Sequence, residues 1–207
     1  MSRWVILTPP ETMVPGADGG PDLPGSVGGR GAHWDLTGDA APDIQGAEAV
    51  ELSQIASAHV ELTGRRIKRT LLLTVRPGTP PDTIASFEAD LMAMPRHIPA
   101  IRSWALSRAT GRWTHAWEQE FADEDGLNGQ YLLHPYHWTY VDRWFDTELP
   151  TAIVAPRLAH LYRTASGPVL TASHCGEAEH PGAIGRSKGE RPDHSRWSLV
   201  RAPRAEG

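Results

Sequence analysis

The densest group of side chains that could transfer protons lies between Tyr131 and Trp138. The Tyr131 hydroxyl donates or accepts a proton, and the imidazole of His137 has a reference pKa of about 6.5, close to neutral pH. A tyrosine and a histidine that share a hydrogen bond form a general acid–base unit. In the alternative interpretation, the same hydrogen bond pins a helix corner and has no catalytic role. The segment therefore predicts a Tyr131–His137 pair whose role is either catalytic or structural.

Further histidines and tryptophans lie close to this pair in the sequence. His134 directly precedes Pro135, so we expect it to cap the end of a helix. His115 lies within a predicted strand, where it either lines an apolar pocket or is a satisfied core histidine. The side chains expected to bind a flat or polyketide-like ligand are Trp113, His115, Trp117, His134 and Trp138. The alternative for the tryptophans is ordinary core and dimer interface.

We predict no metal or nucleotide site, and therefore no cofactor. The three central histidines would suit zinc, but no carboxylate is clearly paired with them. A second group, in the C-terminal segment, has no recognised ligand spacing: His174, Cys175 and His180. The glycine-rich run from Gly28 to Gly31 lacks the strand–loop–helix context of a phosphate-binding loop.

Composition narrows the class of protein. The formal net charge of −5 argues against a nucleic-acid partner, which a basic patch would bind. The single cysteine excludes an internal disulfide framework and fits a reducing compartment. The apolar run from Trp4 to Leu7 is too short for a signal peptide, and no run approaches a membrane span. We expect a cytoplasmic protein with no membrane partner.

The elements that must position these side chains are clearest between residues 67 and 165. Alternating apolar residues predict strands, and spacings of three or four predict helices. The predicted elements are a strand over Ile67–Val75, a helix from Thr79 that ends within Pro95–Pro99, strands over Ile101–Arg108 and Trp113–Phe121, a split helix over Asp123–Leu133 and Pro135–Phe145, and a strand over Ile153–Tyr162. This order predicts an α+β, ferredoxin-like, four-stranded antiparallel sheet with helices on one face. A second copy would cover the other face, which predicts a homodimer.

The flanking segments are rich in Gly and Pro. Residues 1–66 are predicted to be an extension with a short strand at Gly31–Thr37 and a helix at Ala47–Thr63. The helix is indicated by the spacing of Val50, Ile55 and Ala58. No exact internal repeat is visible, although a degenerate half-repeat is possible here. Residues 166–207 are predicted to be a largely disordered tail, with one possible strand at Trp197–Val200.

Four motifs in order carry a resemblance to a known family. They are Ile67 to Leu72, His97 to Ile101, Trp113 to Ala116 and Gln130 to Trp138. Together they resemble the dimeric stress-responsive α/β-barrel (Dabb) family. The resemblance implies that family's ferredoxin-like dimeric barrel for residues 67–165.

The family includes a plant polyketide (olivetolic acid) cyclase, and Tyr131 and His137 match its acid–base pair. The resemblance therefore implies a cofactor-independent enzyme of the cyclase, aldol or dehydration type, acting on a hydrophobic carbonyl or polyketide-like substrate in secondary metabolism. Two pocket positions depart from the family pattern: Arg69 replaces a histidine usual in the first strand, and Leu91 matches a pocket tyrosine of the cyclase. These departures favour the alternative, a non-catalytic stress-response or small-molecule-binding protein.

Overall fold

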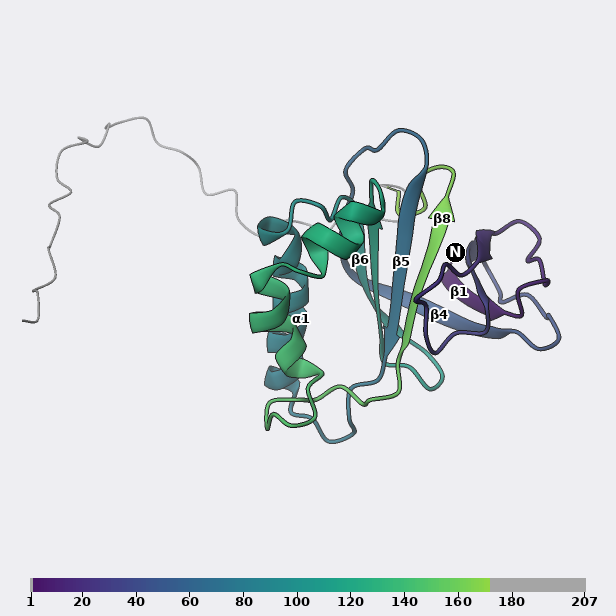
Figure 1. Cartoon of the computed structure of the whole chain (residues 1–207). Helices are drawn as coiled ribbons and strands as arrows, with labels where there is room; N and C mark the ends of the chain where they lie inside the picture. Colours follow the sequence, from purple (N-terminus) through teal and green to yellow (C-terminus); the bar gives the residue numbers. More distant parts are fainter. Residues whose placement is uncertain (1, 172–207) are drawn as a thin grey trace, which may run out of the picture.

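Eight antiparallel strands form one continuous sheet that curls into a nearly closed barrel (Figure 1). The structure is a computed structural model and describes residues 2–171. The strands are β1 (Ser2–Thr8), β2 (Asp18–Pro21), β3 (Ala32–Gly38), β4 (Glu48–Ala58), β5 (Arg66–Leu73), β6 (Trp104–Ala109), β7 (His115–Phe121) and β8 (Ala159–Ala165). The predicted α+β class is confirmed, but the four-stranded sheet is wrong because residues 2–58 supply four more strands.

Helices cover only the sheet half formed by β5 to β8 (Figure 1). Helix α1 (Pro81–His97) begins after Pro80, and its buried apolar face includes Phe87, Leu91 and Met94. The helix ends at His97, within the segment Pro95–Pro99 that was predicted to end it. Because Pro95 lies in the last turn, only one late hydrogen bond is lost, and the amide of Ile98 still donates to the Met94 carbonyl oxygen over 2.8 Å.

The predicted split helix is present, but its turns are wide. It consists of two π-helical segments, η1 (Gly126–Tyr131) and η2 (His137–Val141), followed by the 3-10 turn η3 (Asp142–Trp144). Asp123 caps the first segment, since its Oδ1 accepts a hydrogen bond from the Gly126 amide over 2.8 Å. π-Helical turns are rare in proteins overall, and those that occur are frequently found at functional sites.

The helix predicted over Ala47–Thr63 is wrong, because this segment contains strand β4. Val50 and Leu52 are both buried, as expected for alternate residues of a strand. Val50 pairs with Val5 of β1, and the same strand continues along β6 past a bulge between Gln54 and Ala56. The apolar spacing of this segment also fits a helix, so pairing with β1 and β6 decides its structure.

The two halves of the sheet repeat one strand order. The full order is β2-β3-β1-β4-β6-β7-β5-β8. Within each half, β1–β4 or β5–β8, the strands lie side by side in the order second, third, first, fourth. The halves join through β4 and β6, and on the other side the Leu23 amide donates to the Tyr162 carbonyl oxygen over 2.7 Å. The N-terminal half therefore supplies what a second copy was expected to supply. The homodimer stays a prediction. The uncovered sheet face from which it was predicted is covered by the N-terminal half.

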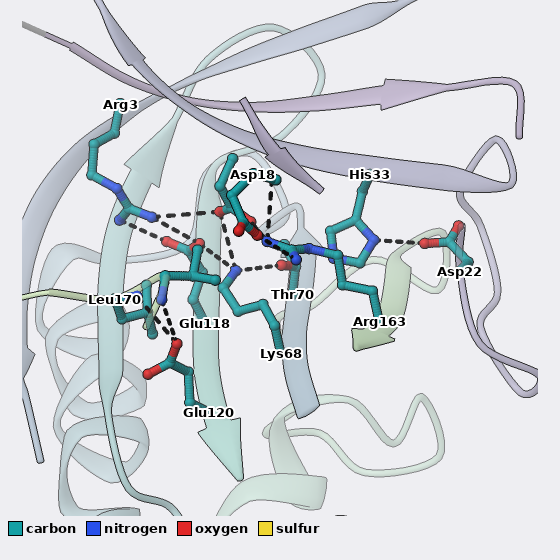
Figure 2. A network of polar contacts seen from close by, with 12 residues as sticks. Arg3, Asp18, Asp22, His33, Lys68, Thr70, Glu118, Glu120, Arg163 and Leu170 are labelled. Carbon is teal, nitrogen blue, oxygen red and sulfur yellow. Dashed lines mark hydrogen bonds and ion pairs between the residues drawn. The ribbon is translucent and has the colours of Figure 1, made fainter. Parts of the chain in front are cut away.

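A network of ion pairs fills part of the barrel interior (Figure 2). Lys68 Nζ lies 2.8 Å from Glu118 Oε1 and 3.2 Å from Asp35 Oδ1. Arg163 contacts Asp35 Oδ2 at 2.7 Å, and Arg3 contacts Glu118 Oε2 at 2.9 Å. Burial alone would raise the pKa of Asp35, but Lys68, Arg163 and Arg3 outweigh it and hold that pKa well below its usual range. Each of these buried cations therefore has a carboxylate partner.

The C-terminal segment reaches one part of this interior. The amides of Val169 and Leu170 donate to Glu120 Oε1, and both side chains are buried. The rest of the predicted tail, with its possible strand Trp197–Val200 and its histidine–cysteine group, lies outside the described residues. Within residues 2–171, no helix is long and apolar enough to cross a membrane.

Candidate functional site

A cavity of about 210 Å³ lies where the outer face of the sheet meets α1 and the split helix. Its apolar walls are Leu71, Leu91, Trp117, Leu132, Val141, Phe145 and Leu158. Its polar lining residues are Arg69, Tyr131, His137, Asp142 and His160. The cavity is thus mainly apolar, with a small group of polar side chains, as is common for ligand sites.

Tyr131 comes from the end of η1 and is buried. Its ring lies edge-on to His137, with centroids 4.8 Å apart, and beneath the guanidinium of Arg69, whose Cζ is 5.1 Å from the ring centroid. Within residues 2–171, Tyr131 and His137 share no hydrogen bond. Burial raises the pKa of the Tyr131 hydroxyl, against the opposing effect of the Arg69 charge, so the hydroxyl is protonated at neutral pH.

His137 comes from the first position of η2, and its side chain is 14% exposed. Nδ1 lies 3.1 Å from Asp142 Oδ1, although the angle is outside hydrogen-bond geometry. The two residues are five apart, the spacing that a π-helical turn brings together. The wide turn therefore gives His137 a carboxylate neighbour.

Arg69 comes from β5 and is 3% exposed. Its Nε donates to His160 Nε2 over 2.6 Å, and its Nη1 donates to Gln119 Oε1 over 2.6 Å. Strand pairing explains this cluster, because Arg69 lies opposite Gln119 on β7 and opposite Tyr162 on β8. Burial, followed by the Arg69 charge, lowers the pKa of His160 to about 2, so His160 is neutral.

Five of the predicted site residues line the cavity: Arg69, Leu91, Trp117, Tyr131 and His137. His115 does not. It is fully buried elsewhere on the sheet, with Nε2 3.0 Å from Glu88 Oε1 and 3.0 Å from Arg108 Nη1. Burial lowers its pKa despite the opposing effect of the hydrogen bond that His115 makes to the Glu88 carboxylate. This geometry is that of a satisfied core histidine.

Trp113, His134 and Trp138 also lie outside the cavity. Trp113 packs with the residues inside the barrel and its Nε1 donates to Glu48 Oε1 over 2.8 Å. His134 Nδ1 accepts a hydrogen bond from the Tyr136 amide over 3.1 Å, at the corner between the helical segments. Trp138 is 55% exposed. Among residues 2–171, no group of three or more potential ligands could hold a metal ion.

Sequence reasoning missed His160, Asp142 and Gln119 as members of the site. His160 lies in a predicted strand, but only the pairing of β8 with β5 brings it beside Arg69. Asp142 could have been found from its spacing to His137 only if a π-helical turn had been expected. Gln119 shares a strand face with Trp117, and this alternation was the available signal.

One protein-family model matches the middle of the chain. Residues 67–155 match the family model of the stress-responsive A/B barrel domain, Dabb. The Dabb match covers β5 to η3 and so includes the five predicted residues that line the cavity, but not His160 or the N-terminal half. No curated protein matches the chain.

Two solved structures are similar to this chain at low sequence identity. A candidate monooxygenase from Lactobacillus acidophilus NCFM has a TM-score of 0.51 at 8% identity, covering 80% of this chain and 95% of its own. A structure described as a major regulator of staphylococcal pathogenesis has a TM-score of 0.47 at 10% identity, covering 78% of this chain and 98% of its own. The first likeness shows the fold alone. It spans more of this chain than the Dabb segment does, so the barrel fold includes N-terminal strands.

Proposed function

We propose that this chain is an enzyme without metal or organic cofactor that moves protons on a small hydrophobic carbonyl compound. The observation that carries the proposal is the meeting of Tyr131 and His137, with ring centroids 4.8 Å apart, at a mainly apolar cavity. A water-poor site strengthens the interactions of the few polar groups that it contains.

In the proposed step, His137 removes a proton from the carbon next to the carbonyl group. The electron pair of the C–H bond moves toward the carbonyl oxygen, which accepts a hydrogen bond from the Tyr131 hydroxyl. The raised pKa of Tyr131 supports this role, because burial keeps the hydroxyl protonated and able to donate. The Asp142 carboxylate, 3.1 Å from Nδ1, stabilises the imidazolium that forms.

The enolate then has two outcomes that balance. Its carbon attacks a second carbonyl group of the same molecule, and the imidazolium of His137 returns the proton to the new alkoxide, which closes a ring. Alternatively, a hydroxyl group two carbons from the first carbonyl leaves as water with that proton, which is a dehydration. Neither outcome needs an oxidant or a reductant.

The cavity limits the substrate. An apolar cavity of about 150 Å³ holds one benzene molecule. The volume here is about 210 Å³, which suits a single ring with a short substituent or a short aliphatic chain. A polyketide-like substrate would therefore have to be short.

A second candidate function is binding without turnover. It is favoured by the absence of a hydrogen bond between Tyr131 and His137 within the described residues. In this case the cavity would hold the same class of ligand, and the polar groups would only orient it. The difference between the two candidates is whether the bound ligand exchanges protons.

Proton exchange in D₂O tests the proposal. We expect the protein to accelerate loss of the ¹H NMR signals next to the carbonyl group of 2-pentanone or of its carboxylated relative laevulinate. Tyr131→Phe and His137→Ala should each lower the rate by about 10²-fold or more. The exposed residues Tyr140 and His97 provide the matched controls Tyr140→Phe and His97→Ala. Unchanged exchange in both site variants would show that the catalytic assignment is wrong, and bound ligand without exchange would favour the binding protein.

A further inference from the structure

Arg69 is a buried cation that has no carboxylate partner. A guanidinium group carries a positive charge, and Arg69 is 3% exposed. Among the ion pairs of residues 2–171, none within 4.0 Å involves Arg69. Buried charges in proteins are normally paired, because an unpaired charge loses its hydration without compensation.

The groups that contact Arg69 are all neutral. His160 accepts the Nε–H through Nε2, and Gln119 accepts an Nη1–H through its amide oxygen. The Tyr131 ring offers its face, with the guanidinium carbon 5.1 Å from the centroid. Burial raises the pKa of the Tyr162 hydroxyl beside Arg69, so this group is also neutral near pH 7. These contacts hold and orient the guanidinium, but they leave its charge uncompensated.

One carboxylate does line the same cavity, and it is already engaged. Asp142 lies 3.1 Å from His137 Nδ1, and its side chain is 49% exposed. Within residues 2–171, a carboxylate side chain therefore lies beside His137, and none lies beside Arg69. The uncompensated charge therefore faces a cavity whose other walls are mainly apolar.

We propose that Arg69 binds a carboxylate group of the ligand and that the ligand is a small monocarboxylate with a hydrophobic body. Two of the five N–H groups of the guanidinium donate to His160 and Gln119, so others are available to a ligand. A guanidinium matches the two oxygens of a carboxylate in a planar pair of hydrogen bonds. This inference rests on the proposed function for the site and names its substrate class, a keto acid rather than a neutral ketone.

The test compares benzoate with benzamide, which has nearly the same shape and no charge. Titration calorimetry of the full chain should give about tenfold or greater preference for benzoate, as expected for hydrogen bonds to a charged group. Arg69→Met should abolish the preference, and Arg69→Lys should keep part of it. Arg65→Met is the matched control, because Arg65 is exposed and directly precedes β5.

Equal affinities of the natural chain for benzoate and benzamide would overturn the inference, as would a preference that survives Arg69→Met. If Arg69→Met fails to fold, Arg69→Gln takes its place, and the comparison of the two ligands on the natural chain still decides. Binding needs no turnover, so the two proposals fail separately. Proton exchange on 2-pentanone and laevulinate at similar rates overturns only the carboxylate site, and benzoate preference without any exchange overturns only the enzyme.

Discussion

The barrel interior and the cavity under the split helix both bury cations, but only the interior pairs them. Lys68 has two carboxylates within 3.2 Å, and Arg163 lies 2.7 Å from Asp35. Arg69, on the opposite face of the same strand as Lys68, has only neutral partners. Because the two faces of β5 share one backbone, the difference is due to the residues that the neighbouring strands place opposite each face. Buried cations that are all paired with carboxylates are typical of a structural network. A buried cation without a carboxylate partner at a cavity indicates a binding site for an anionic ligand.

Asp35→Asn is the change expected to break the interior most severely. It removes the charge that Lys68 and Arg163 share, and breaking a buried pair in this way costs about 3–5 kcal/mol. Urea denaturation measures the loss of unfolding free energy. The exposed residue Asp43 gives the control Asp43→Asn, expected to change stability by less than about 0.5 kcal/mol. A loss for Asp35→Asn no larger than that of the control would contradict a structural role for the network.

The second prediction concerns acid stability. The pKa of His160 is about 2 in the folded chain, mainly because of burial, and lies well above that in the unfolded chain. The unfolded state therefore binds more protons below about pH 6.5, and the unfolding free energy falls as the pH drops from there. One such histidine contributes at most about 1.4 kcal/mol per pH unit. The interior carboxylates, whose pKa values are lowered, add to this loss only below about pH 4.

His160→Gln separates this contribution from the rest. The variant should reduce the slope of unfolding free energy between pH 6 and pH 4.5 by about 1.4 kcal/mol per unit. The slope does not vanish, because burial also lowers the pKa of His33 and of His115. Thermal or urea unfolding at several pH values provides the measurement, with the exposed His97→Gln as the control. A slope equal to that of the natural chain would mean that His160 is already charged in the folded state.

Arg69→Met sharpens the comparison, because it should affect stability much less than Asp35→Asn does. The substitution removes an uncompensated buried charge, which favours folding, and leaves His160 and Gln119 without a donor, which opposes it. We expect a net change within about 1 kcal/mol in urea denaturation. A loss as large as that of Asp35→Asn would show that Arg69 is a structural residue like Lys68.

The same comparison shows what sequence could predict. Alternating apolar residues predicted strands β5 and β7, and the corner motif led to Tyr131 and His137. Trp113 was expected to bind the ligand but packs inside the barrel, because strand β7 begins only at His115 and its alternation does not extend to Trp113. The strands of residues 2–58 were largely missed, since loops replace the helices that would normally separate them and β4 carries a helical spacing. Arg69 lacks a carboxylate partner because of the residues that β7 and β8 place opposite it, and no local sequence pattern specifies this strand pairing.

Trp138 gives the smallest expected effect, and it tests whether nearness in sequence means nearness to the site. It follows His137 directly, yet it is 55% exposed and lies outside the cavity, while Trp117 is fully buried and lines it. Trp138→Ala should change stability by less than about 0.5 kcal/mol and leave benzoate affinity unaltered. Trp117→Ala is the contrasting variant and should cost about 3–5 kcal/mol. If Trp138→Ala weakened benzoate binding as Arg69→Met does, the cavity would have to extend to the exposed side of the split helix.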